Sequence, residues 1–240
     1  MQKSQYPNAK LGLSTPVIPA HIGFIVDGNR RWAREKGLPT LEGHRKGLKK
    51  VEDIIEAISE AKIPYATFYL FSTENWSRSK EEVSYLMTLA SERILSLGEK
   101  ARKNNQKVIF LSTENNRLDK KLKEKFKSVE DSTKNCTSGT IALAFNYGGR
   151  EEIADAAKKL SEKNLEFTPE NIEKNLYHPE IPPLDIIVRT SGEERLSGFM
   201  LWRAAYAEFL FLKKYWPDIE KSDLKNILKE FKNRSRRFGK

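Results

Sequence analysis

Residues 22–32 read Ile22-Gly23-Phe24-Ile25-Val26-Asp27-Gly28-Asn29-Arg30-Arg31-Trp32. The first five residues lack the polar alternation of a half-exposed strand, which is typical of a β-strand covered on both faces. The Asp-Gly-Asn that follows is typical of a turn into a helix. Further apolar runs recur along the chain, and together with the first they give the candidate strands Ile22–Val26, Ala66–Phe71, Val108–Leu111, Ile141–Phe145, Asp185–Val188 and Phe209–Leu212.

Longer segments between these runs carry apolar residues at helical spacing, as in Gly47–Lys62 and Lys80–Asn104. Helix starts are indicated at Thr168-Pro169-Glu170 and at Ser79-Lys80-Glu81-Glu82, the second as a capping box. Strands that alternate with helices predict a single α/β domain with a mostly parallel central sheet of about six strands flanked by helices. We place this domain at 21–240, after a polar N-terminal extension at 1–20, and leave the strand order open.

The composition narrows the class of protein. The chain has 240 residues, a formal net charge of +10, 38% hydrophobic and 32% charged residues, which fits a globular protein. No apolar run approaches the roughly 18 residues of a membrane-spanning helix, and no secretory signal is found, so we expect a cytoplasmic protein. A single cysteine, Cys136, and three scattered histidines exclude an internal disulfide and a cysteine-based zinc site. Any metal is therefore expected to be a hard cation held by oxygen.

Polar residues gather where the predicted strands end. In open parallel sheets, ligands bind beyond the carboxyl ends of the strands, so these residues are expected to share one rim. Four such segments are Asp27–Trp32, Ser72–Arg78, Asn146–Arg150 and Arg189–Ser197.

The first segment is suited to a phosphate. Gly28 allows close backbone approach at a helix start, Arg31 adds a fixed charge, and Asp27 could hold Mg²⁺ against the same phosphate. The alternative is that the Asp or Asn merely caps a helix. Arg189, Arg195 and Ser197 form a second anion-binding set, whose alternative is a solvated surface loop. Two anion sites on one rim favour two phosphorylated substrates, or one large one.

Three further polar residues are candidates with ordinary alternatives. Asn75, near Arg78 and Trp76, could orient a water or assist a proton transfer, or could be only a turn residue. His44 could donate to a phosphate or cap a helix. Glu208 could supply a second metal carboxylate or be an exposed glutamate.

Five ordered blocks carry a resemblance to a known family. They are Asp27-Gly28-Asn29-x-Arg31-Trp32, Phe71-Ser72-Thr73-Glu74-Asn75-Trp76-x-Arg78, Asn146-Tyr147-Gly148-Gly149-Arg150, Arg189-Thr190-x-Gly192-Glu193-x-Arg195-x-Ser197 and Tyr206-Ala207-Glu208. In order and spacing they are similar to the cis-prenyltransferases, and within these to the bacterial undecaprenyl diphosphate synthases. The similarity runs from about the first strand to the C-terminus.

The resemblance implies that the protein condenses farnesyl diphosphate with successive isopentenyl diphosphates and requires Mg²⁺. The expected product is a long-chain polyprenyl diphosphate, undecaprenyl diphosphate. Such a product would partition to the membrane and serve as a lipid carrier precursor in cell-wall synthesis. It further implies an apolar cleft lined by the helix at Lys80–Asn104. The implied roles are Asp27 and Asn75 in catalysis; Asp27 and Glu208 at the metal; and Gly28, Asn29, Arg30, Arg31, Trp32, His44, Ser72, Thr73, Glu74, Trp76, Arg78, Arg189, Arg195, Leu196 and Ser197 in substrate binding.

Within that set, Gly28 to Arg31 and His44 correspond to the allylic diphosphate site, and Arg189, Arg195 and Ser197 to the isopentenyl diphosphate site. The chain departs from the family pattern at four positions, where Arg30 replaces the common Gly, Thr40 a frequent Arg, Ser191 a Gly and Glu194 a His. The absent arginine removes one expected phosphate contact, for which Arg30 could compensate.

The C-terminal Arg237-Phe238-Gly239 resembles the family's Arg-x-Gly, which implies a homodimer. The enzyme is expected in the cytoplasm, either free or attached to the inner face of the membrane.

The nearest alternative function is that of a cis-prenyltransferase that makes a shorter chain. A nucleic-acid-binding protein is disfavoured because the lysines are scattered and no recognition motif is found. A phosphohydrolase with Asp27 as nucleophile would normally carry a second Asp where Asn29 stands.

Overall fold

The computed structural model describes residues 18–115 and 117–234. Within them, six parallel strands form one sheet in the order β3-β4-β2-β1-β5-β6. The α/β prediction is confirmed, and each predicted strand is present with its ends within two residues of the predicted ones. The strands are β1 (His21–Ile25), β2 (Tyr65–Ser72), β3 (Lys107–Leu111), β4 (Thr140–Tyr147), β5 (Ile186–Arg189) and β6 (Glu208–Phe211).

The helices between the strands follow the predicted pattern, with one boundary different. The α-helices are α1 (Asn29–Glu35), α2 (Thr40–Glu60), α3 (Lys80–Lys103), α4 (Lys120–Thr133), α5 (Gly149–Glu162), α6 (Pro169–Asn175) and α7 (Lys221–Asn233), with short 3-10 turns η1 (Thr73–Ser77) and η2 (Trp216–Asp218). Helix α2 starts seven residues before the predicted Gly47, directly after Pro39, because its first two turns are largely polar and hide the helical period. The cap predicted at Thr168 is present, since its hydroxyl accepts from Asn171 N at 3.2 Å.

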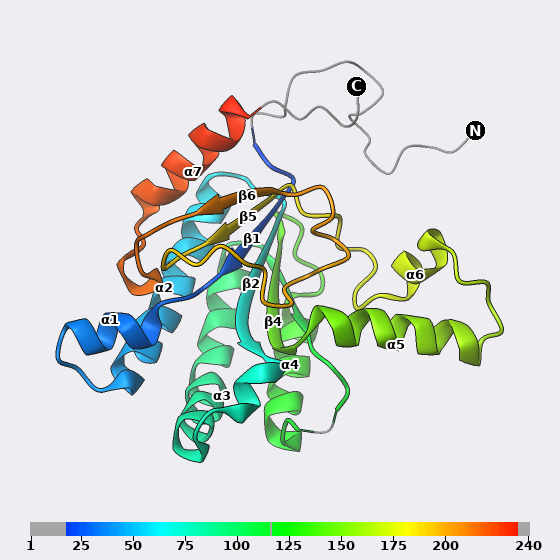
Figure 1. Ribbon diagram of the computed structural model, residues 1–240, viewed down its shortest axis with the longest axis horizontal. Helices are drawn as coiled ribbons and strands as arrows, with labels where there is room; N and C mark the ends of the chain where they lie inside the picture. Colours follow the sequence, from blue (N-terminus) through cyan, green and yellow to red (C-terminus); the bar gives the residue numbers. More distant parts are fainter. Residues whose placement is uncertain (1–17, 116, 235–240) are drawn as a thin grey trace.

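The two faces of the sheet bury side chains of different size. Large residues such as Phe24 and Phe68 pack on one face against α2, α3, α4 and α7. On the other face, Gly23 leaves room for the Phe199 ring, because a Cβ at this position would lie 2.7 Å from it. That face is covered by the segment from Tyr177 to Ala204, and α5 and α6 extend to this side, away from α2 and α7 (Figure 1). Both faces are thus covered, which explains why the strands lack polar alternation.

The connections after β1 and β5 leave the sheet on opposite faces. After β1 the chain enters α1 and α2 on the large-residue face, whereas after β5 it crosses the small-residue face before reaching β6. Such a switch between adjacent parallel strands opens a crevice at their carboxyl ends. Asp27 follows β1 and Arg189 ends β5, so the fold itself places these two residues at the crevice.

Two predictions lie outside the described residues. They are the N-terminal extension, described only from residue 18 onward, and the Arg237-Phe238-Gly239 motif. In the part of the chain that the structure describes, every helix is too short or too polar to cross a lipid bilayer.

Candidate active site

A cleft with a cavity volume of about 780 Å³ opens at the carboxyl ends of β1, β2 and β5. It gathers predicted residues that are far apart in the sequence. Those that line it are Asp27, Gly28, Asn29, Arg30, Arg31, His44, Ser72, Asn75, Arg78, Arg189 and Ser197. Three of the four segments expected at one rim therefore contribute to the cleft, whereas no residue of Asn146–Arg150 lines it.

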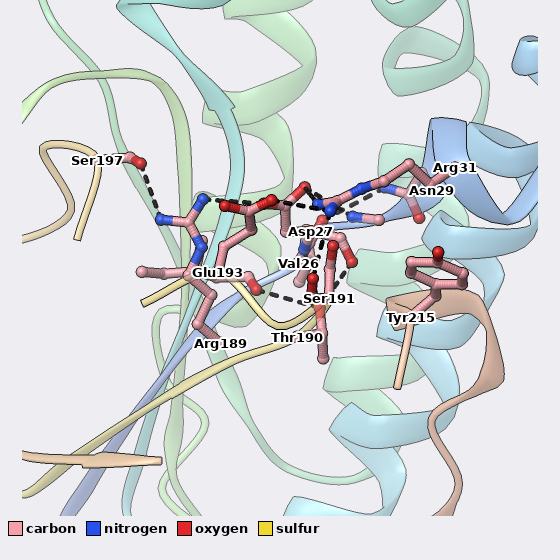
Figure 2. Close-up of polar contacts among 12 residues, drawn as sticks. Val26, Asp27, Asn29, Arg31, Arg189, Thr190, Ser191, Glu193, Ser197 and Tyr215 are labelled. Carbon is pink, nitrogen blue, oxygen red and sulfur yellow. Dashed lines mark hydrogen bonds and ion pairs between the residues drawn. The ribbon is translucent and has the colours of Figure 1, made fainter. Parts of the chain in front are cut away.

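Asp27 and Arg189 form the centre of the cleft. The Arg189 side chain is only 4% exposed, and its Nη2 donates to Asp27 Oδ2 at 2.8 Å. Its Nη1 donates to the Ser197 hydroxyl at 2.8 Å, as Figure 2 shows. Because a buried guanidinium needs a charged partner, Asp27 fixes Arg189 in this orientation. The predicted link between Arg189 and Ser197 is therefore present as a hydrogen bond.

The backbone after β1 turns sharply at Gly28. Its φ of 101° lies in the left-handed region, and a Cβ here would lie 2.6 Å from the Tyr215 ring. Gly28 is the N-cap residue of α1 and no side chain caps this helix, so the cap alternative for Asp27 and Asn29 does not hold. Instead Asp27 Oδ1 accepts from Gly28 N at 2.7 Å, which leaves the carboxylate facing the cleft.

Arg31 is held by four groups at the front of the cleft, of which Asp27 places its Oδ1 3.6 Å from Arg31 Nη2. Arg31 Nη1 donates to Glu193 Oε1 at 2.8 Å and to the Ser191 carbonyl at 3.3 Å. Its guanidinium lies 5.8 Å from the centre of the Tyr215 ring, which supports it from below in Figure 2. Glu193 Oε2 also contacts Arg195 Nη1. Glu193 and Tyr215 were not among the predicted site residues, and only the Glu193 position fell inside a motif.

A second carboxylate, Glu82, organises the back of the cleft. It is buried in the first turn of α3, and its Oε1 accepts from His44 Nε2 at 3.0 Å and from Arg78 Nη1 at 2.9 Å. Arg30 Nη1 approaches its other oxygen at 3.8 Å. Burial lowers the pKa of His44, against the opposing effect of Glu82, so the imidazole is neutral at pH 7.

The capping box predicted at Ser79 forms only in part. Ser79 accepts from Glu82 N at 3.2 Å, but the Glu82 carboxylate turns to His44 and Arg78 instead of back to the helix end. The reason is electrostatic, since a buried carboxylate gains more from two cationic or N–H donors than from one backbone amide. The sequence signal that could have identified Glu82 is its i,i+4 spacing from Arg78.

The 3-10 turn η1 presents Asn75 to the cleft. Asn75 Oδ1 accepts from Ser72 N at 3.1 Å, which closes the turn. Trp76 anchors it from behind, because its indole donates to the buried Asn146 Oδ1 at 2.7 Å. Thr73 and Glu74, by contrast, lie outside the cleft lining.

Three other predicted residues lie away from the cleft lining. Trp32 is buried in the fold and donates to Asp218 Oδ1 at 2.7 Å. Leu196 packs against the core on the small-residue face. Arg195 joins the rim through its side-chain contact with Glu193 and through its carbonyl, which accepts from Arg189 Nη1.

The two carboxylates predicted at the metal are not brought together within one chain. Glu208 pairs in register with Ile186, which pairs with Ile22, whereas Asp27 lies five residues further along β1. At about 3.3 Å per residue, this puts Glu208 roughly 17 Å away along the strand direction, at the amino end of the sheet. Its carboxylate pairs with Arg234 Nη1 at 3.2 Å. No cluster of three or more metal-ligating side chains occurs among residues 18–115 and 117–234.

The four departures from the family pattern lie in different surroundings. Arg30 and Thr40 both line the cleft, so Arg30 provides a cation where Thr40 provides none. Ser191 has a φ of 82° and its buried hydroxyl lacks a hydrogen-bond partner in the described structure. Glu194 is exposed.

An apolar cavity adjoins the polar cleft. It lies between α2, α3 and the sheet, with a volume of about 60 Å³. The two spaces share the lining residues Val26, Asn29, His44, Leu70 and Leu86. The predicted apolar lining by α3 is present, since Leu86, Leu89, Ala90, Ile94 and Leu97 all contribute.

Comparison with known proteins agrees with this geometry. A family model described as "Putative undecaprenyl diphosphate synthase" matches residues 25–239. An isoprenyl transferase of Thermotoga maritima is 42% identical over 227 residues, which cover 92% of this chain and 97% of the relative. A tritrans,polycis-undecaprenyl-diphosphate synthase (geranylgeranyl-diphosphate specific) of Thermoplasma volcanium is 42% identical over 231 residues, covering 92% and 89%.

A solved structure extends the likeness to three dimensions. The crystal structure of lavandulyl diphosphate synthase from Lavandula x intermedia in complex with dimethylallyl diphosphate superposes with a TM-score of 0.87 at 30% identity. The match covers 93% of this chain and 99% of that one. The chain therefore belongs to the undecaprenyl diphosphate synthase family of cis-prenyltransferases, enzymes that transfer prenyl groups.

Proposed function

We propose that the protein condenses farnesyl diphosphate with successive isopentenyl diphosphates to form undecaprenyl diphosphate with new cis double bonds. One observation carries the proposal: a rim with two arginine groups opens directly into an apolar cavity between α2 and α3. The rim suits two diphosphates, and the apolar lining along α3 suits the start of a hydrocarbon chain, although the cavity of about 60 Å³ is smaller than a farnesyl group.

The two diphosphates are assigned to different parts of the rim. The allylic diphosphate binds near Arg31, Arg78 and His44, from which the cavity continues. The isopentenyl diphosphate binds near Arg195 and the Arg189–Ser197 pair. Holding both reactants side by side brings the reacting carbons to near-attack distance.

The reaction breaks the allylic C–O bond, and its electron pair leaves with the diphosphate. The π electrons of isopentenyl diphosphate form the new bond to the allylic carbon, and a proton departs to restore a double bond. Arginines stabilise the leaving diphosphate most strongly as its charge grows. Asn75, a neutral amide, orients a water molecule that takes up this proton.

The residues of the cleft fit a magnesium ion through one protein carboxylate. Mg²⁺ is usually held by one or two carboxylates together with substrate phosphate oxygens. Asp27 is half-exposed, faces the cleft and lies beside the proposed diphosphate positions. It would hold the ion, whose bound charge stabilises the departing diphosphate. Glu208 does not join it within one chain, so its assignment as a metal ligand needs a second copy.

A homodimer, a cytoplasmic location and release of product to the membrane complete the proposal. They rest on the resemblance described above. Light scattering and membrane fractionation test them separately from the chemistry.

The test is incorporation of labelled isopentenyl diphosphate into butanol-extractable lipid, with and without Mg²⁺, followed by mass spectrometry. Farnesyl, geranylgeranyl and dimethylallyl diphosphate are compared as primers, because the relatives differ in the substrates they are named for. We expect Mg²⁺-dependent undecaprenyl product with farnesyl diphosphate. A dominant shorter chain, or preference for another primer, would contradict the chain-length or primer assignment, and absence of product with all three would contradict the reaction.

A further inference from the structure

Glu193 stands between the two proposed diphosphate positions. Its Oε1 accepts from Arg31 Nη1 at 2.8 Å, and its Oε2 contacts Arg195 Nη1. Arg31 comes from the segment after β1, and Arg195 from the segment after β5. One carboxylate therefore neutralises an arginine from each side of the rim.

The Glu193 carboxylate is ionised at neutral pH. Hydrogen bonds from Arg195 and Arg31 lower its pKa below the ordinary value for glutamate. It thus presents a single negative charge to two guanidinium groups, as one oxygen of a diphosphate would.

The bridge is weak enough to be displaced. The Glu193 side chain is 25% exposed, and the side chains of Arg31 and Arg195 are 32% and 60% exposed. Exposed ion pairs of this kind contribute little to stability. A diphosphate, with more charge and more acceptor oxygens than a carboxylate, forms stronger charge-assisted bonds to the same guanidinium.

We propose that Glu193 is a displaceable bridge that couples the two diphosphate positions, an inference that rests on the proposed function. A diphosphate that takes Arg31 is repelled by the Glu193 carboxylate and drives it away from the rim. Because the same carboxylate holds Arg195, that displacement frees the second arginine for the second diphosphate. Opening the bridge weakens the binding of the first ligand, and the second ligand binds more tightly because the bridge is already open. The coupling is reciprocal.

The expected coupling is modest. An exposed ion pair contributes little to stability, so the second ligand should gain up to about fivefold in affinity. The neighbouring Glu194 offers a matched control, because it is exposed and carries the same charge in the same loop.

The experiment is calorimetric titration of the full-length protein and of the variants Glu193→Gln, Glu193→Ala and Glu194→Gln. Inorganic pyrophosphate is the first probe. The second is isopentenyl diphosphate, titrated with and without saturating farnesyl thiolodiphosphate, which cannot react readily. We expect wild type and Glu194→Gln to bind isopentenyl diphosphate about two- to fivefold more tightly when the analogue is present. Both Glu193 variants should bind pyrophosphate more tightly than wild type and lose the dependence on the analogue.

Two results would overturn the bridge. Either the Glu193 variants keep the wild-type coupling, or they bind pyrophosphate more weakly than wild type and Glu194→Gln. If wild type makes product but shows no coupling, only the bridge fails. If wild type binds neither substrate and makes no product, the proposed function fails together with the bridge.

Discussion

The Glu82 and Glu193 carboxylates both hold cationic groups at the rim of one cleft, yet they are buried to different extents. The Glu82 side chain is 10% exposed and contacts the buried His44. The Glu193 side chain is 25% exposed and lies between two partly exposed arginines. Breaking a buried pair leaves a charge without a partner where water cannot replace it, whereas an exposed pair separates easily. Glu82 is therefore suited to fix its partners, and Glu193 to release them.

The elements that carry the two carboxylates agree with this difference. Glu82 is in the first turn of the 24-residue helix α3, whose inner face packs against the core. Glu193 lies in the irregular segment between β5 and β6. A side chain on a packed helix moves less readily than one on a surface segment. The carboxylate–guanidinium pair at Glu82 thus holds side chains in position, whereas the pairs at Glu193 can be exchanged for a ligand.

The largest effect is expected at Asp27, the carboxylate that pairs with the buried Arg189 at 2.8 Å and faces the cleft. Asp27→Ala should lower kcat by about a hundred- to a thousandfold, because the proposed metal ligand and the charge that orients Arg189 are both lost. Steady-state kinetics with labelled isopentenyl diphosphate measures this. Near wild-type turnover would contradict the role of Asp27.

Asp27→Asn separates orientation from charge. The amide oxygen still accepts from Arg189 Nη2, so the fold and the position of Arg189 should be kept, as circular dichroism and thermal unfolding can report. Activity should stay low, because a neutral amide is a poor ligand for Mg²⁺. Restored activity in this variant would mean that Asp27 acts only by orienting Arg189.

The next effect tests the comparison directly through stability. Glu82→Ala should lower the free energy of unfolding by about 2–3 kcal/mol, less than for a fully buried pair because Arg78 can reach solvent. Glu193→Ala should change the free energy of unfolding far less than Glu82→Ala does. Glu81→Ala, an exposed glutamate in the same helical turn as Glu82, is the control. Urea unfolding of the three variants gives the result, and equal losses at Glu82 and Glu193 would remove the distinction between them.

A smaller effect is expected at Arg195, on the exposed side of the rim. Arg195→Ala should raise the KM for isopentenyl diphosphate about tenfold, the equivalent of one charge-assisted hydrogen bond. The KM for the allylic primer should change by less than about twofold, since Arg31 and Arg78 remain. An equal rise in both constants would contradict the division of the rim between two substrates.

The sequence predicted the strands and the rim well, for physical reasons that are visible in the structure. Runs such as Ile22–Val26 are apolar on both faces because both faces are covered, and polar residues placed directly after them reach the same edge of a parallel sheet. The sequence did not show how far Glu208 lies from Asp27 within one chain. Glu208 starts β6 whereas Asp27 follows β1, so within one chain the two carboxylates lie at opposite ends of the parallel sheet.

The residues that the sequence did not identify act through contacts across the fold. Glu82 was interpreted as part of a helix cap, because a local pattern explained it and its contact with His44 spans 38 positions. Tyr215 supports Arg31 from a loop that carries no motif. Such pairings depend on how elements pack, which local spacing does not encode.

The smallest expected effect is on the protonation of His44, and it sharpens the contrast between the two carboxylates. Burial lowers the pKa of His44 while Glu82 opposes the shift. Glu82→Gln should therefore lower that pKa further, and Glu193→Gln should leave it unchanged, as an NMR titration of the imidazole can measure.

Because the folded protein binds this proton less readily than the unfolded chain, the contribution of His44 to stability is complete above about pH 6.5 and declines as the pH falls, by at most about 1.4 kcal/mol per pH unit. The difference in unfolding free energy between wild type and His44→Gln should therefore shrink as the pH falls. Taking this difference removes the contribution of His21, which titrates in both proteins. If Glu193→Gln moved the His44 pKa as much as Glu82→Gln does, the two clusters would be one electrostatic unit, and a fixed back and an exchangeable front of the cleft could not be distinguished.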